Sequence, residues 1–103
     1  LVPGTAFCEW EGEAGSKRKV WFGRTDAALF AFAGLWRQTK DGPRMAFLTT
    51  EANEIVGAVH PKAMPVLLDA EDHDVWLTGD YEAATGLAQP FDDSRMEIVE
   101  REG

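Results

Sequence analysis

Two side chains of this sequence are suited to proton transfer, Glu9 and His60. Glu9 lies in the stretch AFCEW, and His60 comes directly before the stretch PKAMP. A carboxylate and an imidazole that share one pocket can act as general acid and base near neutral pH. For each residue the alternative is an idle surface group, because most strand carboxylates and loop histidines are solvated. The residue types alone leave both interpretations open.

Cys8 is the single cysteine of the chain and the third reactive side chain. Its place beside Glu9 suggests a nucleophile. However, it fits no metal-ligand spacing and no recognised Cys–His spacing. We therefore predict that Cys8 is a small buried apolar residue, and we expect no metal and no cofactor. One cysteine cannot form an internal disulfide, which favours a reducing compartment and predicts a cytoplasmic protein.

The composition is that of one globular domain, with 45% hydrophobic and 27% charged residues in a chain of 103. A net charge of −8 argues against non-specific binding to a phosphate backbone. Half of the acidic residues lie within 69–74 and 92–102, whereas most lysines and arginines lie within 17–44. This distribution leaves room for a locally basic face. No apolar run approaches the length of a membrane span, so no membrane partner is expected.

The first half of the chain has the pattern of antiparallel strands. Runs rich in aromatic and β-branched residues predict strands over 6–11, 19–24, 29–36 and 44–49. Turn-forming residues separate them, so we expect a β-meander that forms part of a pseudo-barrel. The third strand is apolar on both faces and is predicted to be central, with Phe30, Phe32 and Trp36 in the core.

The second half predicts short helices and an irregular loop. A helix is expected over 50–56, with Thr50 as N-cap and Gly57 as its stop. Two prolines exclude regular structure from 60–65, and a brief buried strand over 66–68 follows. Asp69 and Asp80 are expected to cap two further helices, and 96–99 alternates like an edge strand. The class is α+β, one domain over 1–103.

Three blocks of the chain resemble one known family. They are LVP with FCEW (1–3 and 7–10), FAFAGLW (30–36), and TTEAN with VHPKAMPV (49–53 and 59–66). In this order and spacing they resemble the SRAP domain of the SOS-response-associated peptidases, over about 1–78. Both ends of the domain look trimmed, so we expect this chain to be its central to C-terminal portion.

The resemblance implies a specific chemistry. SRAP proteins remove their initiator Met autoproteolytically, and the exposed N-terminal cysteine crosslinks covalently to abasic sites in single-stranded DNA. A Glu and a His in the pocket transfer the protons, and Glu9 and His60 occupy those positions. The resemblance therefore implies Glu9 and His60 as catalytic residues and abasic single-stranded DNA as partner. The crosslinking cysteine is expected from a stretch before Leu1, so we do not expect this chain alone to be active.

Thr49, Thr50, Asn53 and Lys62 are candidate contacts to DNA phosphates. The first three lie at or near the N-terminus of the predicted helix, and a helix N-terminus favours anions. Helix capping is the alternative for them, and an isolated loop lysine such as Lys62 is often idle. We predict Thr49, Thr50 and Lys62 as DNA-binding residues.

Two other classes of function remain open at this stage. The chain could be a non-catalytic SRAP-like remnant that binds DNA or a protein. It could also be a structural domain that dimerises through unpaired strand edges. The sequence does not identify any protein partner.

Overall fold

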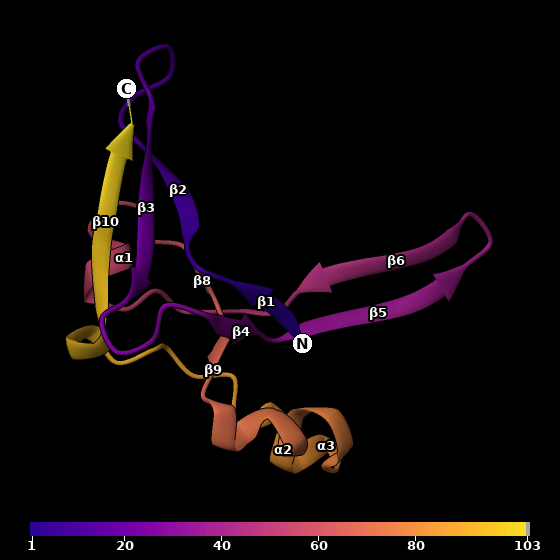
Figure 1. Cartoon of the computed structure of the whole chain (residues 1–103). Coiled ribbons are helices and arrows are strands. Elements are labelled where there is room, and N and C mark those ends of the chain that lie inside the picture. The colour runs from indigo at the N-terminus through magenta and orange to yellow at the C-terminus, as the bar shows by residue number, and fades with distance from the viewer. Residues whose placement is uncertain (103) are drawn as a thin grey trace.

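The fold is described from a computed structural model, in which residues 1–102 are placed (Figure 1). These residues form ten strands and five short helical segments, and seven of the strands come before the first helix. The strands are β1 (Val2–Gly4), β2 (Phe7–Glu11), β3 (Arg18–Arg24), β4 (Phe30–Phe32), β5 (Gly34–Thr39), β6 (Gly42–Phe47), β7 (Thr49–Thr50), β8 (Met64–Pro65), β9 (Leu67–Leu68) and β10 (Met96–Glu102). The helical segments are α1 (Glu54–Gly57), η1 (Ala70–Asp72), α2 (His73–Thr78), α3 (Tyr81–Thr85) and η2 (Asp93–Arg95). The predicted α+β class is confirmed.

The strands divide among four small antiparallel sheets instead of one meander. Their orders are β10-β3-β2, β1-β4-β9, β5-β6 and β7-β8. Strands β3 and β4 follow each other in sequence but pair with different neighbours. No sheet of residues 1–102 closes into a barrel.

The predicted strand over 29–36 breaks at Ala33 into β4 and β5. The Ala33 amide donates to the Val66 carbonyl at 2.9 Å, and the Ala33 carbonyl accepts from the Leu48 amide at 2.9 Å. The Val66 amide in turn donates to the Leu48 carbonyl at 2.9 Å. This triangle of three backbone segments ends the pairing of β4 with β9 and starts the β5–β6 hairpin. A pattern of apolar residues cannot reveal such a change of partner.

The main core lies between the two three-stranded sheets and α1. Its buried residues come from distant parts of the chain: Val20, Phe22, Phe30, Phe32, Val56, Met64, Leu67, Phe91 and Met96. Phe7 packs on this core, since its ring stacks on Phe22 at 5.3 Å and meets the edge of Phe32 at 6.0 Å between centroids. The core positions predicted for Phe30 and Phe32 are confirmed. These rings fix strand β2, which carries Glu9.

The core position predicted for Trp36 is wrong, because this side chain is 73% exposed. Trp36 lies on the β5–β6 hairpin, which extends away from the rest of the molecule (Figure 1). The turn over 40–43 does join the two strands as predicted, with Gly42 at φ 105°. The hairpin itself was therefore predictable, whereas its surroundings were not.

The helix predicted over 50–56 is shorter and is capped by another residue. It runs from Glu54 to Gly57, and the Asn53 side chain accepts the Val56 amide. Thr50 instead belongs to strand β7. Asp80 caps α3 as predicted, accepting the Ala83 amide at 2.8 Å. No helix within residues 1–102 is long and apolar enough to cross a membrane.

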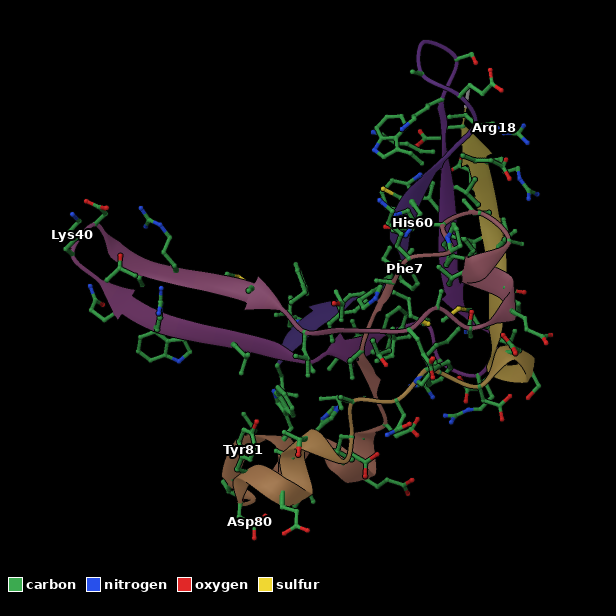
Figure 2. The ribbon with its side chains drawn as sticks, turned by 180° about the vertical axis from the view of Figure 1, so that it is seen from behind. Phe7, Arg18, Lys40, His60, Asp80 and Tyr81 are labelled. Atoms are coloured by element: carbon green, nitrogen blue, oxygen red, sulfur yellow. The ribbon has the colours of Figure 1, made fainter. Side chains whose placement is uncertain are left out.

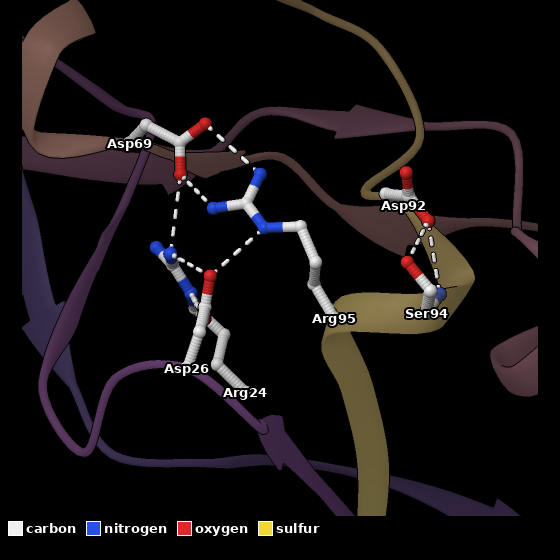
Figure 3. Close-up of polar contacts among 6 residues, drawn as sticks. All are labelled: Arg24, Asp26, Asp69, Asp92, Ser94 and Arg95. Atoms are coloured by element: carbon white, nitrogen blue, oxygen red, sulfur yellow. Dashed lines mark hydrogen bonds and ion pairs between the residues drawn. The ribbon is translucent and has the colours of Figure 1, made fainter.

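Asp69 makes no side-chain capping bond to η1 and joins an ion cluster instead (Figure 3). Its carboxylate pairs with Arg95 and with Arg24, whose nearest nitrogen lies at 3.2 Å. Asp26 bridges the same two guanidinium groups, at 2.7 Å from Arg24 and 2.8 Å from Arg95. The ring of Phe91 contacts both guanidinium groups, since the Cζ atoms of Arg24 and Arg95 lie 4.9 and 4.6 Å from the ring centroid. The cluster therefore joins the end of β3, the end of β9 and the start of β10.

We expect this cluster to make the fold sensitive to acid. Hydrogen bonds from Arg24 and then Arg95 hold the pKa of Asp26 well below its usual value. Hydrogen bonding to Arg95 likewise lowers the pKa of Asp69. A depressed folded-state pKa contributes stability above the unfolded value of about 4, and this contribution is lost as pH falls below it. The melting temperature should therefore drop between about pH 5 and pH 3.

Asp26→Asn provides the test of this acid sensitivity. The variant should be less stable than the parent at pH 6 and lose less further stability on acidification. Asp41→Asn, at the exposed hairpin tip, is the matched control and should follow the parent. An equal fall in melting temperature for the parent and Asp26→Asn between pH 6 and pH 3 would contradict the assignment of this acid sensitivity to Asp26.

Candidate functional site

Glu9 and His60, 51 positions apart in sequence, are in direct contact. The Oε2 atom of Glu9 lies 3.1 Å from Nδ1 of His60. Their side chains are 23% and 38% exposed respectively, so solvent reaches the pair from one side. The loop that carries His60 runs beside β2, as Figure 2 shows near the labelled Phe7. The two residues singled out from the sequence are thus brought together.

The contacts of His60 indicate which ring nitrogen holds the proton. Nδ1 lies 3.1 Å from the Glu9 carboxylate and 3.1 Å from the Ala63 carbonyl oxygen. The Ala63 carbonyl can only accept a hydrogen bond, and the same holds for the Glu9 carboxylate when it is ionised. Nδ1 must therefore be the donor. In the neutral ring Nε2 is then the acceptor, and it has no partner within residues 1–102. The arrangement orients Nε2 to take up or release a proton.

Strand pairing positions Glu9. Residues 7 and 9 lie on the same face of β2, because side chains alternate along a strand. Phe7 and Glu9 are opposite Phe22 and Val20 of β3, and both of these are fully buried. Because Phe7 packs on the core, Glu9 also projects from the core-facing side of β2. Its carboxylate lies where solvent still reaches that side of the sheet.

The end of α1 positions His60. Its backbone amide donates to the Val56 carbonyl at 2.7 Å, and Val56 is itself fully buried. Pro61 follows directly, and proline cannot continue a helix. The His60 side chain is therefore fixed between a buried helix and a rigid turn.

Glu9 lines a cavity of about 310 Å³ whose other walls are mostly apolar. The walls come from four parts of the chain: Ala6, Phe7, Cys8, Glu9, Phe32, Phe47 and Pro65. Glu9 is the one carboxylate among these residues. A mostly apolar pocket with a single ionisable group is typical of sites for small ligands or small portions of larger ones. Phe32, Phe47 and Pro65 were not predicted as site residues, because no local pattern reveals walls built from separate strands.

Cys8 is half-buried and lines this cavity, so it is less buried than the sequence predicts. On β2 it alternates with Phe7 and Glu9 and lies opposite Trp21 of β3. Its thiol is therefore on the other face of the strand from the Glu9 carboxylate. Nothing pairs Cys8 with His60 or with a carboxylate as an activated nucleophile within residues 1–102.

The three predicted DNA-binding residues differ in their exposure and in their contacts. Thr49 is exposed and pairs with Pro65, which forms a cavity wall. Thr50 is half-buried, and its hydroxyl donates to the Ala88 carbonyl at 3.3 Å. Lys62 is exposed on the loop that follows His60.

Asn53 has a structural role. Its Oδ1 accepts the Val56 amide at 2.9 Å, and its Nδ2 donates to the Phe91 carbonyl at 2.8 Å. The residue is 8% exposed, so the amide is directed into the protein. The capping alternative, and not phosphate binding, describes this residue.

One group of carboxylates has the spacing of a metal site. Ligand atoms of Asp69, Glu71 and Asp72 lie within 4.8 Å of one another. However, the Asp69 carboxylate already pairs with Arg24 and Arg95. A cation would have to compete with two guanidinium groups, so this donor set gives no support to a metal centre.

Comparison with known proteins identifies the family. The model for SOS response associated peptidase (SRAP) matches residues 1–101. The chain belongs to the SRAP family. A crystal structure of a protein from Bacteroides thetaiotaomicron has the same fold, with a TM-score of 0.82 and 24% identity over 96% of this chain and 48% of that chain. A crystal structure of a protein from Bordetella bronchiseptica matches with a TM-score of 0.80 and 24% identity, over 95% of this chain and 53% of that chain. No curated protein matches.

This SRAP chain spans about half the length of those two solved relatives. The three sequence blocks that resemble the family occupy β1 and β2, β4 and β5, and the segment from β7 to β8. These are the segments that carry Glu9, Phe32, His60 and Pro65. The blocks that resemble the family therefore contain Glu9, His60 and most of the cavity walls.

Proposed function

We propose that this chain supplies the acid–base part of an SRAP site that binds single-stranded DNA and forms a covalent link to an abasic site. The observation that carries the proposal is the 3.1 Å contact between Glu9 and His60 beside an apolar cavity. A base-free deoxyribose is small enough to enter a cavity of about 310 Å³. Membership of the SRAP family supports this choice of substrate class.

Each covalent step in this proposal requires a proton transfer. An α-amine adds to the sugar aldehyde, and the resulting carbinolamine loses water to give an imine. A thiol on the same cysteine then adds to the imine carbon, so that one water is released in forming the thiazolidine. His60 would accept at Nε2 the proton that the attacking amine loses, and its Nδ1 proton would pass to Glu9. Glu9 would then donate a proton to the departing hydroxyl, and the proton that the thiol loses as the C–S bond forms would restore the pair. The family places the amine and thiol on an N-terminal cysteine, which is a different residue from Cys8.

Thr49, Thr50 and Lys62 are proposed to hold the phosphates beside the cavity. Lys62 is exposed within the segment over 60–65 that carries His60, and the exposed Thr49 pairs with Pro65 at the end of that segment. A hydroxyl and an ammonium group are suitable donors to phosphate oxygens. With a net charge of −8 overall, the chain would bind DNA through these local contacts and not through a general positive field.

A covalent gel shift tests the proposal. The full gene product is incubated with a single-stranded oligonucleotide that contains one abasic site and is then analysed on a denaturing gel. The proposal expects a shifted band that survives denaturation and is absent with the undamaged oligonucleotide. Absence of the band in the full product would overturn the covalent role, and retained native binding to single-stranded DNA would favour the non-catalytic alternative.

Cys8→Ala is expected to leave the yield of this crosslink unchanged within about twofold, because an internal cysteine has no free α-amine. Loss of the shifted band, while the circular dichroism spectrum shows a folded protein, would identify Cys8 as the nucleophile instead. Cys8→Ser serves as the closer control for side-chain size.

A further inference from the structure

Phe47 is the most exposed aromatic wall of the cavity beside Glu9. It is the last residue of β6, and its side chain is 49% exposed. The other two aromatic walls are held in the protein, since Phe32 is 6% exposed and Phe7 stacks on the buried Phe22. Of the three rings, Phe47 is therefore the one most accessible to an entering ligand.

Edge contacts between rings connect Phe47 to the strand that carries Glu9. The Phe47 ring meets the edge of Phe32 at 5.6 Å between centroids, and Phe32 meets the edge of Phe7 at 6.0 Å. Phe7 and Glu9 project from the same face of β2. The three rings therefore form one continuous aromatic wall that ends beside the Glu9 carboxylate.

The position of Phe47 on this wall is fixed although half of its side chain is exposed. The next residue, Leu48, is bound on both sides: its amide donates to the Ala33 carbonyl and its carbonyl accepts from the Val66 amide, each at 2.9 Å. The residue opposite Phe47 in β5 is Gly34, which has no side chain to contact the ring. The contact with Phe32 is thus the aromatic contact that orients Phe47.

The size of the cavity limits what can enter it with an aldehyde. Pockets that hold whole small molecules measure about 300–1,000 Å³, and this cavity, at about 310 Å³, is at the small end of that range. The aldehyde of an abasic site brings only a sugar. An aldehyde attached to a pyrimidine brings a planar ring as well, and apolar walls that do not move would have to exclude it.

We propose that Phe47 is a specificity-determining residue, whose ring restricts the cavity to an aldehyde on a base-free sugar and excludes an aldehyde on a base. This inference rests on the proposed function and adds which aldehydes the site admits. Removal of the ring would enlarge the cavity on its accessible side. Glu9 and His60 would stay in place, because neither of them contacts Phe47 in the described structure.

A comparison of two aldehydes tests the role of Phe47. The full gene product is incubated under single-turnover conditions with a single-stranded oligonucleotide that contains either one abasic site or one 5-formyldeoxyuridine. Each rate of covalent capture is divided by the rate for free cysteine, which has the same amine and thiol but no cavity. The parent should favour the abasic site by at least about tenfold on this scale, because one surplus methylene in a fitted pocket already costs about 10–200-fold.

Phe47→Ala should raise the capture rate of the formyl base relative to that of the abasic site by at least about tenfold. Phe47→Leu, which keeps part of the side chain, should give an intermediate ratio. A purely structural role would slow both reactions together and leave their ratio unchanged. Met45→Ala is the matched control, because Met45 lies two residues earlier in β6, is 57% exposed and does not line the cavity.

Two results would overturn the role of Phe47 alone. One is a parent that captures both aldehydes in the same ratio as free cysteine does. The other is a Phe47→Ala variant that is folded by circular dichroism and captures the abasic site, but has the ratio of the parent. Absence of any covalent band from the parent with the abasic oligonucleotide would overturn the proposed function, and the role of Phe47 with it.

Discussion

Glu9→Gln is expected to slow covalent capture of an abasic site by about 10²-fold or more, because a positioned general acid or base contributes 10²–10⁴-fold. Glutamine keeps the size of the side chain and can still hydrogen-bond to Nδ1 of His60, but it cannot exchange a proton. The rate is measured from the appearance of the shifted band under single-turnover conditions with the full gene product. Glu13→Gln, in the exposed turn after β2, is the matched control and should react at the parent rate.

His60→Ala should slow the same step to a similar extent, and the two changes should not be additive. Glu9 contacts Nδ1 and orients the ring, so its removal already impairs His60. We therefore expect the double variant to be little slower than the slower single variant. Independent, multiplicative effects would show that the 3.1 Å contact has no role in the reaction.

Asn53→Ala is expected to lower the free energy of unfolding by about 2–4 kcal/mol, which combines loss of a helix cap with an unpaired buried carbonyl. The side chain connects α1 to the segment before β10, through the Val56 amide and the Phe91 carbonyl. Urea unfolding monitored by circular dichroism gives the value. Because His60 is held by the end of α1, the Asn53→Ala variant should also form the covalent crosslink more slowly.

Asn53→Ser separates the contribution of the helix cap from that of the hydrogen bond to the Phe91 carbonyl. Serine retains an oxygen that can accept the Val56 amide but has no donor for the Phe91 carbonyl, so it should recover about 1 kcal/mol. Thr78→Ala, at the exposed end of α2, is the control for a helix residue outside the core and should cost less than about 1 kcal/mol. Equal stability of Asn53→Ala and the parent would contradict the structural role of Asn53.

Local features of this fold were predictable because they depend on neighbours in sequence. The hairpin partners β2 and β3, the turn over 40–43 and the cap at Asp80 all follow from short-range patterns. The contact of Glu9 with His60 could not be deduced from spacing. The prediction that these two residues share one site came only from the resemblance to the SRAP family.

Features that depend on distant partners were missed. Trp36 belongs to an apolar run typical of a central strand, but the change of partner at Ala33 leaves it on an exposed hairpin. Asp69 has the position of a helix cap, yet two arginines offer it stronger charge-assisted bonds. In both cases a tertiary contact outweighed a correct local preference.

The placement of β10 has a consequence for the timing of assembly. This strand pairs with β3 over Met96–Glu102, so the sheet that carries Glu9 gains its third strand from the last described residues. Chains are synthesised from the N-terminus, and long-range strand pairs must wait for both members. The Glu9 sheet therefore reaches its full width only after residue 102 has left the ribosome. Until then Glu9 lies on the two-stranded ribbon of β2 and β3, which is less stable than the three-stranded sheet.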